Sequence, residues 1–310
     1  MIEFKHALYF ISLYEEGSVT RAARRLNIVQ PALSMQLAKL EAEIGQPLFV
    51  RNARGVQPTP EAKRLYKLFM PVLADFAHAR DQAVQKKGEL VGHVRAGMVV
   101  TIAQGALADT LAAFSSAHPK VTVEVVEGYS HALIESVARG KLDVAIVNKP
   151  RRPPAVNIQP IVEEEFVLVA GANHAGLPAA IPFRQAAGMK MVLPTMDHGL
   201  RSILESLAAR AGLELLPALE VDSINAILEL VAATDFVTLL PRSAVGRSIA
   251  RGQIHAHRVK EPSLYREVIC ATHPKHPLSA AASELARVMI ERVRAAARPV
   301  PSRRRAAAGR

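Results

Sequence analysis

The first strong hydrophobic pattern in the chain is a pair of short amphipathic stretches separated by a tight turn, within residues 17–51. In the first stretch, apolar residues recur at i, i+3, i+4 and i+7, which is typical of a helix with one buried face. These residues are Val19, Ala22, Ala23 and Leu26. Ser18 precedes them as a good N-cap, and the paired alanines allow a second helix to approach closely.

The second stretch follows the turn at residues 27–29 and begins with Gln30 and Pro31, where proline suits a first helical position. Its apolar face is Leu33, Leu37, Leu40 and Ile44, and its polar face is Gln30, Ser34, Met35, Gln36 and Lys39. The pattern predicts a helix-turn-helix whose second helix presents its N-terminal polar face to base edges in the major groove. The alternative is an ordinary helical hairpin with a solvated polar face.

The flanking segments predict the rest of a small domain. Residues 2–16 form a first helix with Leu8 and Ile11 facing inward, and residues 47–58 form a short hairpin wing. In this wing Arg51 and Arg54 would lie along DNA phosphates, which fixes register without reading sequence.

A long helix is predicted to start at residues 59–61, where a threonine N-cap is followed by proline and an acid. Its apolar residues alternate spacings of four and three, which is the seam of a coiled coil and implies a dimer. They are Leu65, Phe69, Val72, Phe76, Ala79 and Ala83. Pro71 should kink this helix. The alternative is that the seam packs on its own domain.

From residue 93 the period changes to alternating strands and helices, which indicates an α/β domain of two lobes with a largely parallel sheet. Strands are expected at residues 94–100, 121–126, 142–147, 166–170, 237–240 and 267–272. Helices are expected at residues 104–116, 130–139, 200–211, 223–233 and 279–297. The last strand and helix would return to complete the first lobe.

The predicted parts of the chain differ in net charge. The chain has 310 residues and a formal net charge of +11, and half of its residues are hydrophobic. Residues 1–90 carry 13 Lys and Arg against 9 Asp and Glu, residues 91–286 carry 18 against 18, and residues 287–310 carry 8 against 1. A basic head with a neutral body fits DNA binding by the head and small-ligand binding by the body. Residues 298–310 lack an apolar period and are predicted to be disordered.

The start of the chain lacks the pattern of a signal peptide and no apolar run reaches membrane-spanning length, so a cytoplasmic protein is expected. The single cysteine, Cys270, cannot form an internal disulfide and is expected in a buried strand.

Residues 1–59 resemble the winged helix-turn-helix domain of LysR-type transcriptional regulators. The matching residues are Phe10, Gly17, Ser18, Ala22, Ala23, Leu26, Gln30, Pro31, Leu33, Ser34, Leu40, Glu41, Gly45, Leu48, Phe49, Arg51 and Thr59. Residues 93–297 are similar to the LysR substrate-binding domain through FSSAHPKVTVEVVEG, LIESVARGKLDVAIV, EEEFVLVAG and LLPRSAV.

The resemblance implies a multi-domain protein: an N-terminal all-α winged helix-turn-helix with a long linker helix, then a two-lobed α/β domain of the periplasmic-binding-protein type. The expected division is residues 1–59 for DNA binding, 60–88 for the dimerisation helix, 89–92 for a hinge, 93–297 for effector binding and 298–310 for the tail. Lobe I would comprise about 93–162 and 267–297, and lobe II about 163–266.

The residues expected to bind DNA are Ser18, Thr20, Arg21, Gln30, Pro31, Ala32, Ser34, Met35, Lys39, Arg51 and Arg54. Two of the helix-turn-helix positions depart from the family. Val29 stands where a capping Ser or Thr is usual, and Met35 stands where Arg is frequent. Since a thioether cannot contact guanine as arginine does, base reading should depend on Gln30, Ser34 and apolar contact with thymine methyls.

Ligands of open two-lobed α/β domains bind at the carboxyl ends of strands, between the lobes. Three such loops are at residues 100–104, 128–131 and 195–201, where Thr101 and Ser130 would cap helices and the helix N-termini would suit a carboxylate. The resemblance places these loops in the effector cleft. The expected effector-binding residues are Thr101, Gln104, Tyr129, Ser130, His131, Met196, His198, Arg201 and Phe236.

His198 and Arg201 are candidate cations opposite an anionic effector, although surface positions at a helix start are the alternative. Phe236 stands where the family often has a glycine-rich turn, and it would narrow the cleft.

Enzyme motifs are absent from the sequence: there is no GxSxG, P-loop or GxGxxG. The metal-like spacings are His255 with His257 and His273 with His276, and neither fits a recognised ligand pattern. No cofactor or metal is expected.

The expected function is an effector-controlled regulator that binds an operator as a homo-oligomer, by resemblance a homotetramer, with RNA polymerase as a further candidate partner. The single cysteine argues against the two-cysteine redox sensing of some relatives. The alternatives are a constitutive repressor or architectural protein with a vestigial cleft, suggested by Phe236, and a periplasmic-type solute binder. The latter would need a signal peptide and no basic head.

Overall fold

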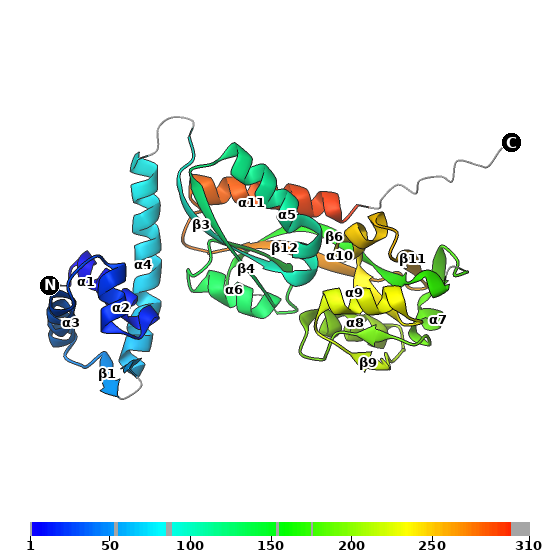
Figure 1. The fold of residues 1–310 in the computed structure, drawn as a ribbon, viewed down its shortest axis with the longest axis horizontal. Coiled ribbons are helices and arrows are strands. Elements are labelled where there is room, and N and C mark those ends of the chain that lie inside the picture. Colours follow the sequence, from blue (N-terminus) through cyan, green and yellow to red (C-terminus); the bar gives the residue numbers. More distant parts are fainter. Residues whose placement is uncertain (1, 53–54, 85–88, 153–154, 175, 299–310) are drawn as a thin grey trace. The chain divides into compact units, whose positions relative to one another are not determined.

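The computed structural model describes residues 2–52, 55–84, 89–152, 155–174 and 176–298. The chain divides into two units, residues 1–86 with 139–141 and residues 87–138 with 142–310 (Figure 1). The expected tail at 299–310 and the expected helix end at 85–88 lie outside the described residues.

The helix-turn-helix forms as predicted in the first unit, from α1 (Phe4–Glu16), α2 (Val19–Arg25) and α3 (Gln30–Ile44). The Ser18 hydroxyl accepts a hydrogen bond from the Arg21 amide at 3.4 Å and so caps α2. Asn27 turns the chain with a φ of 58°, in the left-handed region that asparagine tolerates. Val29 precedes α3 without a side-chain cap.

The core of the first unit joins all three helices. Ala22 and Ala23 are buried where α2 meets its neighbours, and Leu33, Leu37 and Leu40 form the buried face of α3. The prediction for α1 was wrong at one position, since Leu8 is exposed. The inward residues of α1 are His6, Ala7, Phe10, Ile11, Ser12 and Leu13, because the contacts with α2, α3 and α4 turn the helix away from Leu8.

The wing is a two-stranded antiparallel hairpin, β1 (Phe49–Asn52) with β2 (Gly55–Pro58). The Glu41 carboxylate holds its base by accepting hydrogen bonds from the amides of Leu48 at 2.7 Å and Phe49 at 3.2 Å. The wing therefore stays attached to the last turns of α3.

The long helix α4 (Pro60–Val84) is capped by Thr59, whose hydroxyl accepts from the Ala62 amide at 3.2 Å. Its first turns pack on their own unit through Leu65 and Phe69, which agrees with the alternative prediction that the apolar seam packs on its own domain. Farther along, Val72 and Phe76 are exposed on the described helix. The helix continues past Pro71, whose side chain lies outside the description, as does that of Ala83.

The second unit alternates strands and helices, and every strand and helix predicted there is present. The bounds agree within four residues except for the strand expected at 166–170, which begins at Asn157. Its strands are β3 (Gly92–Val99), β4 (Val121–Gly128), β5 (Val144–Asn148), β6 (Asn157–Ala170), β7 (Ala180–Pro182), β8 (Val192–Leu193), β9 (Leu219–Glu220), β10 (Val237–Pro241), β11 (His255–Lys260) and β12 (Tyr265–Thr272). Its helices are α5 (Val100–Ala117), α6 (Ser130–Ala138), α7 (Phe183–Ala187), α8 (Gly199–Arg210), α9 (Ile224–Ala233), α10 (Arg242–Ala250) and α11 (Ala280–Ala296), with a 3₁₀ turn at Ala172–His174.

The expected largely parallel sheet is wrong, because the main sheet is mixed. Its order is β4-β3-β5-β12-β6-β11-β7, with β10 also paired to β6. β3 runs parallel to β4 and β5, but β12 pairs antiparallel with both β5 and β6, and β6 pairs antiparallel with β10 and β11. Strand and helix alternation does not reveal the direction in which long connecting strands cross between lobes.

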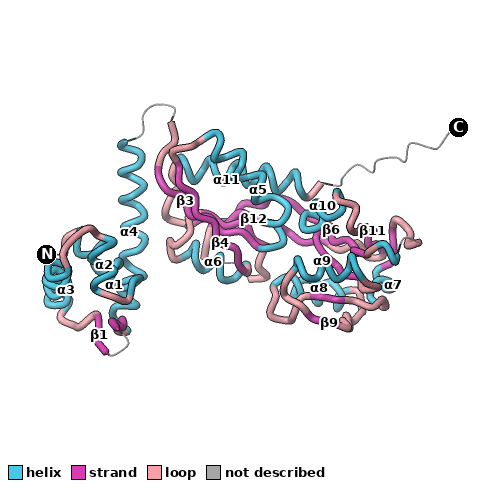
Figure 2. Tube along the Cα trace, in the orientation of Figure 1, coloured by secondary structure: helices cyan, strands magenta, loops and turns pink. Residues whose placement is uncertain are grey.

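Two hydrophobic cores lie along this sheet and form its two lobes. The first gathers α5, α6, α11, the strands β3 and β5 and residues 268–271 of β12, and the second gathers α8, α9, β10 and the last five residues of β6. α5 and α11 lie on one face of the first lobe and α6 on the other (Figure 1). The continuous strands β6 and β12 connect the lobes (Figure 2).

Candidate nucleic-acid interface and ligand cleft

The N-terminal part of α3 presents a polar face to solvent. Its buried residues are three or four positions apart, so most of the side chains between them point outward. Gln30, Pro31, Met35 and Lys39 are exposed, and Ala32 and Ser34 are half-buried. The face combines an amide, a hydroxyl and a thioether, which suits contact with base edges and thymine methyls.

Contacts from α1 and α2 hold neighbouring side chains of this face in place. The Thr20 hydroxyl donates to the Gln30 side-chain oxygen at 3.5 Å, and Arg21 pairs with the Glu16 carboxylate at 3.4 Å. Gln36 turns inward, where its side-chain oxygen lies 3.0 Å from Nε2 of His6. Gln30 is therefore oriented before any contact with DNA, and Gln36 is already engaged.

The wing contributes Arg51, whose backbone lies in β1 opposite Val56. The Arg51 side chain and the whole of Arg54 lie outside the described residues, so their phosphate contacts remain predictions from sequence.

In the second unit, all three predicted loops contribute to a small cavity of about 10 Å³ between the lobes. Val99, Val100, Thr101, Gly128, Tyr129, Ser130 and Asn148 line it from one lobe, and His198, Gly199 and Leu200 line it from the other. A space of this size holds about one water molecule.

Tyr129 and His198 close the cavity from opposite lobes. Their ring centroids are 5.1 Å apart in an edge-to-face arrangement, and the Tyr129 hydroxyl donates to the Asp222 carboxylate at 3.5 Å. Asp222 also accepts from the amide of Thr195 at 3.1 Å and from its hydroxyl at 2.6 Å. The Thr195 hydroxyl lowers the pKa of Asp222, and burial together with the Asp222 charge raises that of Tyr129.

His198 is the buried N-cap of α8, not a surface residue at a helix start. Its Nδ1 accepts a hydrogen bond from the Leu200 amide at 3.1 Å, which requires that nitrogen to be unprotonated. Burial lowers the pKa of His198 below its ordinary value of 6.5, and the nearby Asp222 charge opposes this only in part. A neutral imidazole is the form that this site favours, so His198 is a poor cation for an anionic effector.

This geometry predicts a pH effect that His198→Asn removes. As pH falls below 6.5, the unfolded chain binds a proton at His198 before the folded chain does, so the wild type loses stability from there down to its lowered folded pKa. Asparagine keeps an N-cap but does not titrate. As the pH is lowered from about 7.5 to about 5.5, the wild-type free energy of unfolding, measured in urea titrations, should decrease relative to that of His198→Asn. If the difference in unfolding free energy between the two proteins did not change with pH, the assignment of His198 as a neutral, buried N-cap would be contradicted.

A buried ionic network lies beside the cavity and connects the lobes. Arg266 of β12 donates to the Glu164 carboxylate of β6 at 2.8 Å, to the Thr101 hydroxyl at 2.7 Å and to the Asn148 side-chain oxygen at 3.1 Å. The other Glu164 oxygen accepts from the Ser243 amide at 2.6 Å. Arg266 and Glu164 are almost completely buried. The network joins β5 and α5 of one lobe to α10 of the other.

Thr101 and Ser130 are placed differently from the prediction. α5 begins at Val100 rather than near residue 104, so Thr101 is buried in the first turn and binds Arg266 instead of capping the helix. Ser130 is the first residue of α6, and its hydroxyl accepts from the Asn148 amide at 3.2 Å. Both hydroxyls remain beside the cavity.

Arg201 does not face the cavity as a free cation. It is buried and donates to Glu205 at 2.6 Å, to Glu220 at 2.8 Å and to the Pro194 carbonyl at 3.0 Å. Its charge is neutralised inside the second lobe, because these acceptors surround it. The expectation that Arg201 opposes an effector anion is therefore not supported by its position.

Phe236 does not narrow the cleft. Phe236 lies just before β10, beside the end of that strand that pairs with Ala170 of β6. The opposite end of β10 pairs with Phe166 and leads into α10, which contacts the ionic network. The Lys190 ammonium covers the Phe236 ring at 4.3 Å from its centroid. This position packs on the second core, far along β6 from the cavity.

Three other expected residues lie outside the cavity lining. Gln104 donates to Asn225 across the lobes at 2.9 Å, while its side-chain oxygen is buried without a hydrogen-bond partner in the described part of the chain. His131 and Met196 are exposed. Sequence reasoning also missed Asn148 and Asp222. Asn148 could have been noticed as the polar end of the apolar strand VAIVN, whereas nothing local distinguishes Asp222.

The histidine pairs with metal-like spacing have structural contacts. His257 is buried with Nδ1 at 2.7 Å from the Pro178 carbonyl oxygen. The ring centroids of His273 and His276 are 4.0 Å apart, with the ring planes tilted by 42°. Cys270 is buried in β12 as predicted, and burial raises its pKa to about 12. In the described ranges, no helix is both long enough and apolar enough to cross a membrane.

Comparisons with known proteins cover both units. The model of the LysR substrate binding domain matches residues 87–294, and the model of the bacterial regulatory helix-turn-helix protein, lysR family, matches residues 4–63. The nitrogen assimilation regulatory protein nac of Klebsiella aerogenes is 30% identical over 258 residues, which are 83% of this chain and 84% of that protein.

Two further similarities agree. The HTH-type transcriptional regulator GltR of Bacillus subtilis (strain 168) is 27% identical over 252 residues, 81% of this chain and 84% of that protein. Full-length OxyR from Pseudomonas aeruginosa has a TM-score of 0.77 at 24% identity, covering 96% of this chain and 100% of that one, which shows the shared fold.

Proposed function

The chain belongs to the LysR family of DNA-binding transcriptional regulators, and we propose that α3 reads the operator while a small anionic effector acts between the two lobes. The observation that carries the DNA-reading part is the exposed polar face of α3, in which Thr20 orients Gln30. Ser18, Arg21, Pro31, Ala32 and Lys39 surround Gln30, Ser34 and Met35 and supply phosphate and backbone contacts. Residues 1–59 form the DNA-binding domain in this proposal, and residues 93–297 the effector domain.

The proposed assembly is a homotetramer built from dimers that pair through α4. Val72 and Phe76 support this pairing, since each is more than half exposed within its own unit and gains nothing by facing water. The Phe76 ring also contacts Phe4 of α1, with ring centroids 4.1 Å apart. Paired heads would read a two-fold symmetric operator. The proposed site of action is the cytoplasm, with RNA polymerase as a further partner, and no catalytic step is included.

The wing gives a prediction on salt dependence. Arg51→Ala should weaken binding to operator and unrelated DNA by the same factor, because a phosphate contact carries no sequence information. The slope of log K against log salt should become shallower by about 0.9. Fluorescence anisotropy over a salt series measures both. A change confined to the operator would assign Arg51 to base reading instead.

The effector is proposed to enter the space that Tyr129 and His198 now close. Because the cavity is only about 10 Å³, a ligand larger than water must separate these rings and open the lobes. Effector binding would then favour one lobe arrangement over another, which is the requirement for switching. The closed cavity also favours a second candidate, a constitutive regulator whose cleft takes no ligand.

Thermal-shift screening with small organic acids separates these candidates. A cleft ligand at about 100 times its Kd should stabilise the protein by about 2.7 kcal/mol, and Tyr129→Ala should remove that stabilisation. Val126→Ala is the control, since Val126 is 42% exposed against 41% for Tyr129 and lines neither of the two cavities between the lobes. Absence of any saturable shift across the screen would favour the constitutive regulator.

A further inference from the structure

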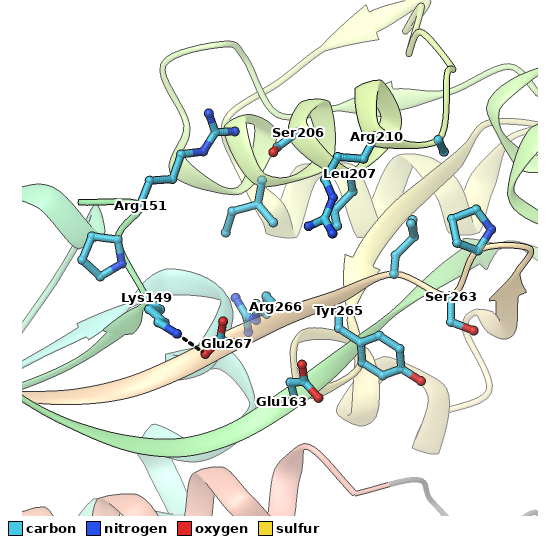
Figure 3. Close-up of a pocket in the computed structure, with 15 residues that line it drawn as sticks. Lys149, Arg151, Glu163, Ser206, Leu207, Arg210, Ser263, Tyr265, Arg266 and Glu267 are labelled. Atoms are coloured by element: carbon cyan, nitrogen blue, oxygen red, sulfur yellow. Dashed lines mark hydrogen bonds and ion pairs between the residues drawn. The ribbon is translucent and has the colours of Figure 1, made fainter. Parts of the chain in front are cut away.

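A second and much larger cavity, of about 640 Å³, is lined by residues of both lobes (Figure 3). Its walls are the segment after β5, the start of β12 and the outer turns of α8. None of its lining residues lines the small cavity at Tyr129 and His198. Its volume is typical of small-molecule sites, whose usual range is about 300–1,000 Å³.

Two of the lining cations are neutralised by their own neighbours. The Lys149 ammonium lies 2.6 Å from the Glu267 carboxylate, and Arg266 is turned into the buried network with Glu164. These two pairs fix the wall of the cavity on the β12 side. They leave little charge for a ligand.

Two other arginines that line the cavity, Arg151 and Arg210, are not neutralised by an acidic neighbour among the described residues. Arg151 donates once, to the Ser202 carbonyl at 3.3 Å, and Arg210 makes no hydrogen bond or ion pair with any other residue in the described parts of the chain. Figure 3 shows both side chains extending along the cavity, with Glu163 on the opposite side beside Tyr265. The two guanidinium groups thus bring positive charge to the α8 side of the cavity, and no ion pair of the described residues neutralises it.

The surface between the arginines is partly apolar. Ile203 and Leu207 of α8 line the cavity and are partly buried against the second core, and the buried Leu264 also lines it. Guanidinium groups match carboxylates in a bidentate geometry, and an apolar lining favours a ligand with hydrocarbon between its charged ends.

We propose that this cavity binds a small organic dicarboxylate, with one carboxylate on Arg151 and the other on Arg210. Arg151 follows β5 of the first lobe, and Arg210 is in the last turn of α8 in the second lobe. A ligand held by both arginines links the lobes at a site separate from the cleft at Tyr129. The binding itself is independent of the proposed function, and only its regulatory consequence rests on that function.

Isothermal titration calorimetry of the full chain tests the proposal with succinate, glutarate and adipate as probes. At least one should bind saturably, with valerate and inorganic phosphate binding at least about tenfold more weakly, because each lacks either the second carboxylate or the apolar body. Arg151→Gln and Arg210→Gln should each weaken binding at least about tenfold. Arg152→Gln and Arg184→Gln remove equally exposed arginines outside the cavity and should leave the affinity unchanged.

Tyr129→Ala separates this proposal from the cleft proposal. Dicarboxylate binding should survive that substitution, because Tyr129 is not part of this cavity. Binding lost in Tyr129→Ala but kept in both arginine variants would overturn the dicarboxylate cavity and support the cleft. Absence of binding by all three dicarboxylates would also overturn it, while leaving the cleft to its own screen.

Discussion

Replacing Gln30 and Ser34 together with alanine is expected to abolish operator preference, reducing specific affinity to the level of unrelated DNA. Each good contact to a base edge contributes about 1–3 kcal/mol of discrimination, so losing both lowers operator affinity by roughly 30-fold or more. Neither side chain belongs to the buried core of the first unit, so the fold should persist. Competition binding with operator and scrambled duplexes gives the ratio directly.

The matched control is the double variant Gln185→Ala with Ser115→Ala. It removes the same two chemical groups from exposed positions on α7 and α5 of the second unit. Its operator preference should equal that of the wild type. Preference that survives in the Gln30 and Ser34 variant would show that α3 does not dock through its N-terminal face.

Replacing Arg266 with methionine is expected to cause the largest loss of stability. The change leaves the Glu164 carboxylate buried without its cation, and removes the donor to Thr101 and Asn148. Breaking a buried pair from one side costs about 3–5 kcal/mol, which corresponds to a drop in the melting temperature of the second unit of roughly 6–20 °C. Differential scanning calorimetry measures this loss.

Arg287→Met is the control for this prediction. Arg287 pairs with Glu284 at 2.8 Å on the surface of α11, where water and salt screen the charges. Its loss should be much smaller. Combining Arg266→Met with Glu164→Gln should recover part of the stability, because no uncompensated charge then remains. Equal losses of stability for Arg266→Met and Arg287→Met would contradict the claim that the buried interlobe network stabilises the second unit more than a surface ion pair does.

The sequence predicted the parts of the fold that local periodicity determines. The helix-turn-helix was predictable because Ala22, Ala23, Leu33 and Leu40 repeat at helical spacing and prove to be buried. The longer strands and most helices of the second unit were predictable from their apolar runs. The elements that were not predicted are β7, β8, β9, β11, α7 and α10. The direction of β6 and β12 was not, since antiparallel crossing between lobes depends on contacts between distant segments.

The candidate site divides in the same way. The loops near Thr101, Tyr129, Ser130 and His198, which strand-to-helix transitions indicate locally, do line one cavity. The ion pairs that engage the candidate arginines could not be predicted from the sequence. Arg201 is engaged by Glu220, nineteen positions later, and Arg266 by Glu164, more than one hundred positions earlier. Which arginine remains free for a ligand therefore depends on tertiary structure.

Genome-wide mapping of bound DNA, compared between the wild type and the Gln30 and Ser34 double variant, tests the central claim most directly. If α3 reads an operator for a paired assembly, the wild type should occupy discrete sites that share a two-fold symmetric sequence, and the variant should lose them at equal expression. Wild-type occupancy without a shared sequence, or identical sites for both proteins, would contradict the account.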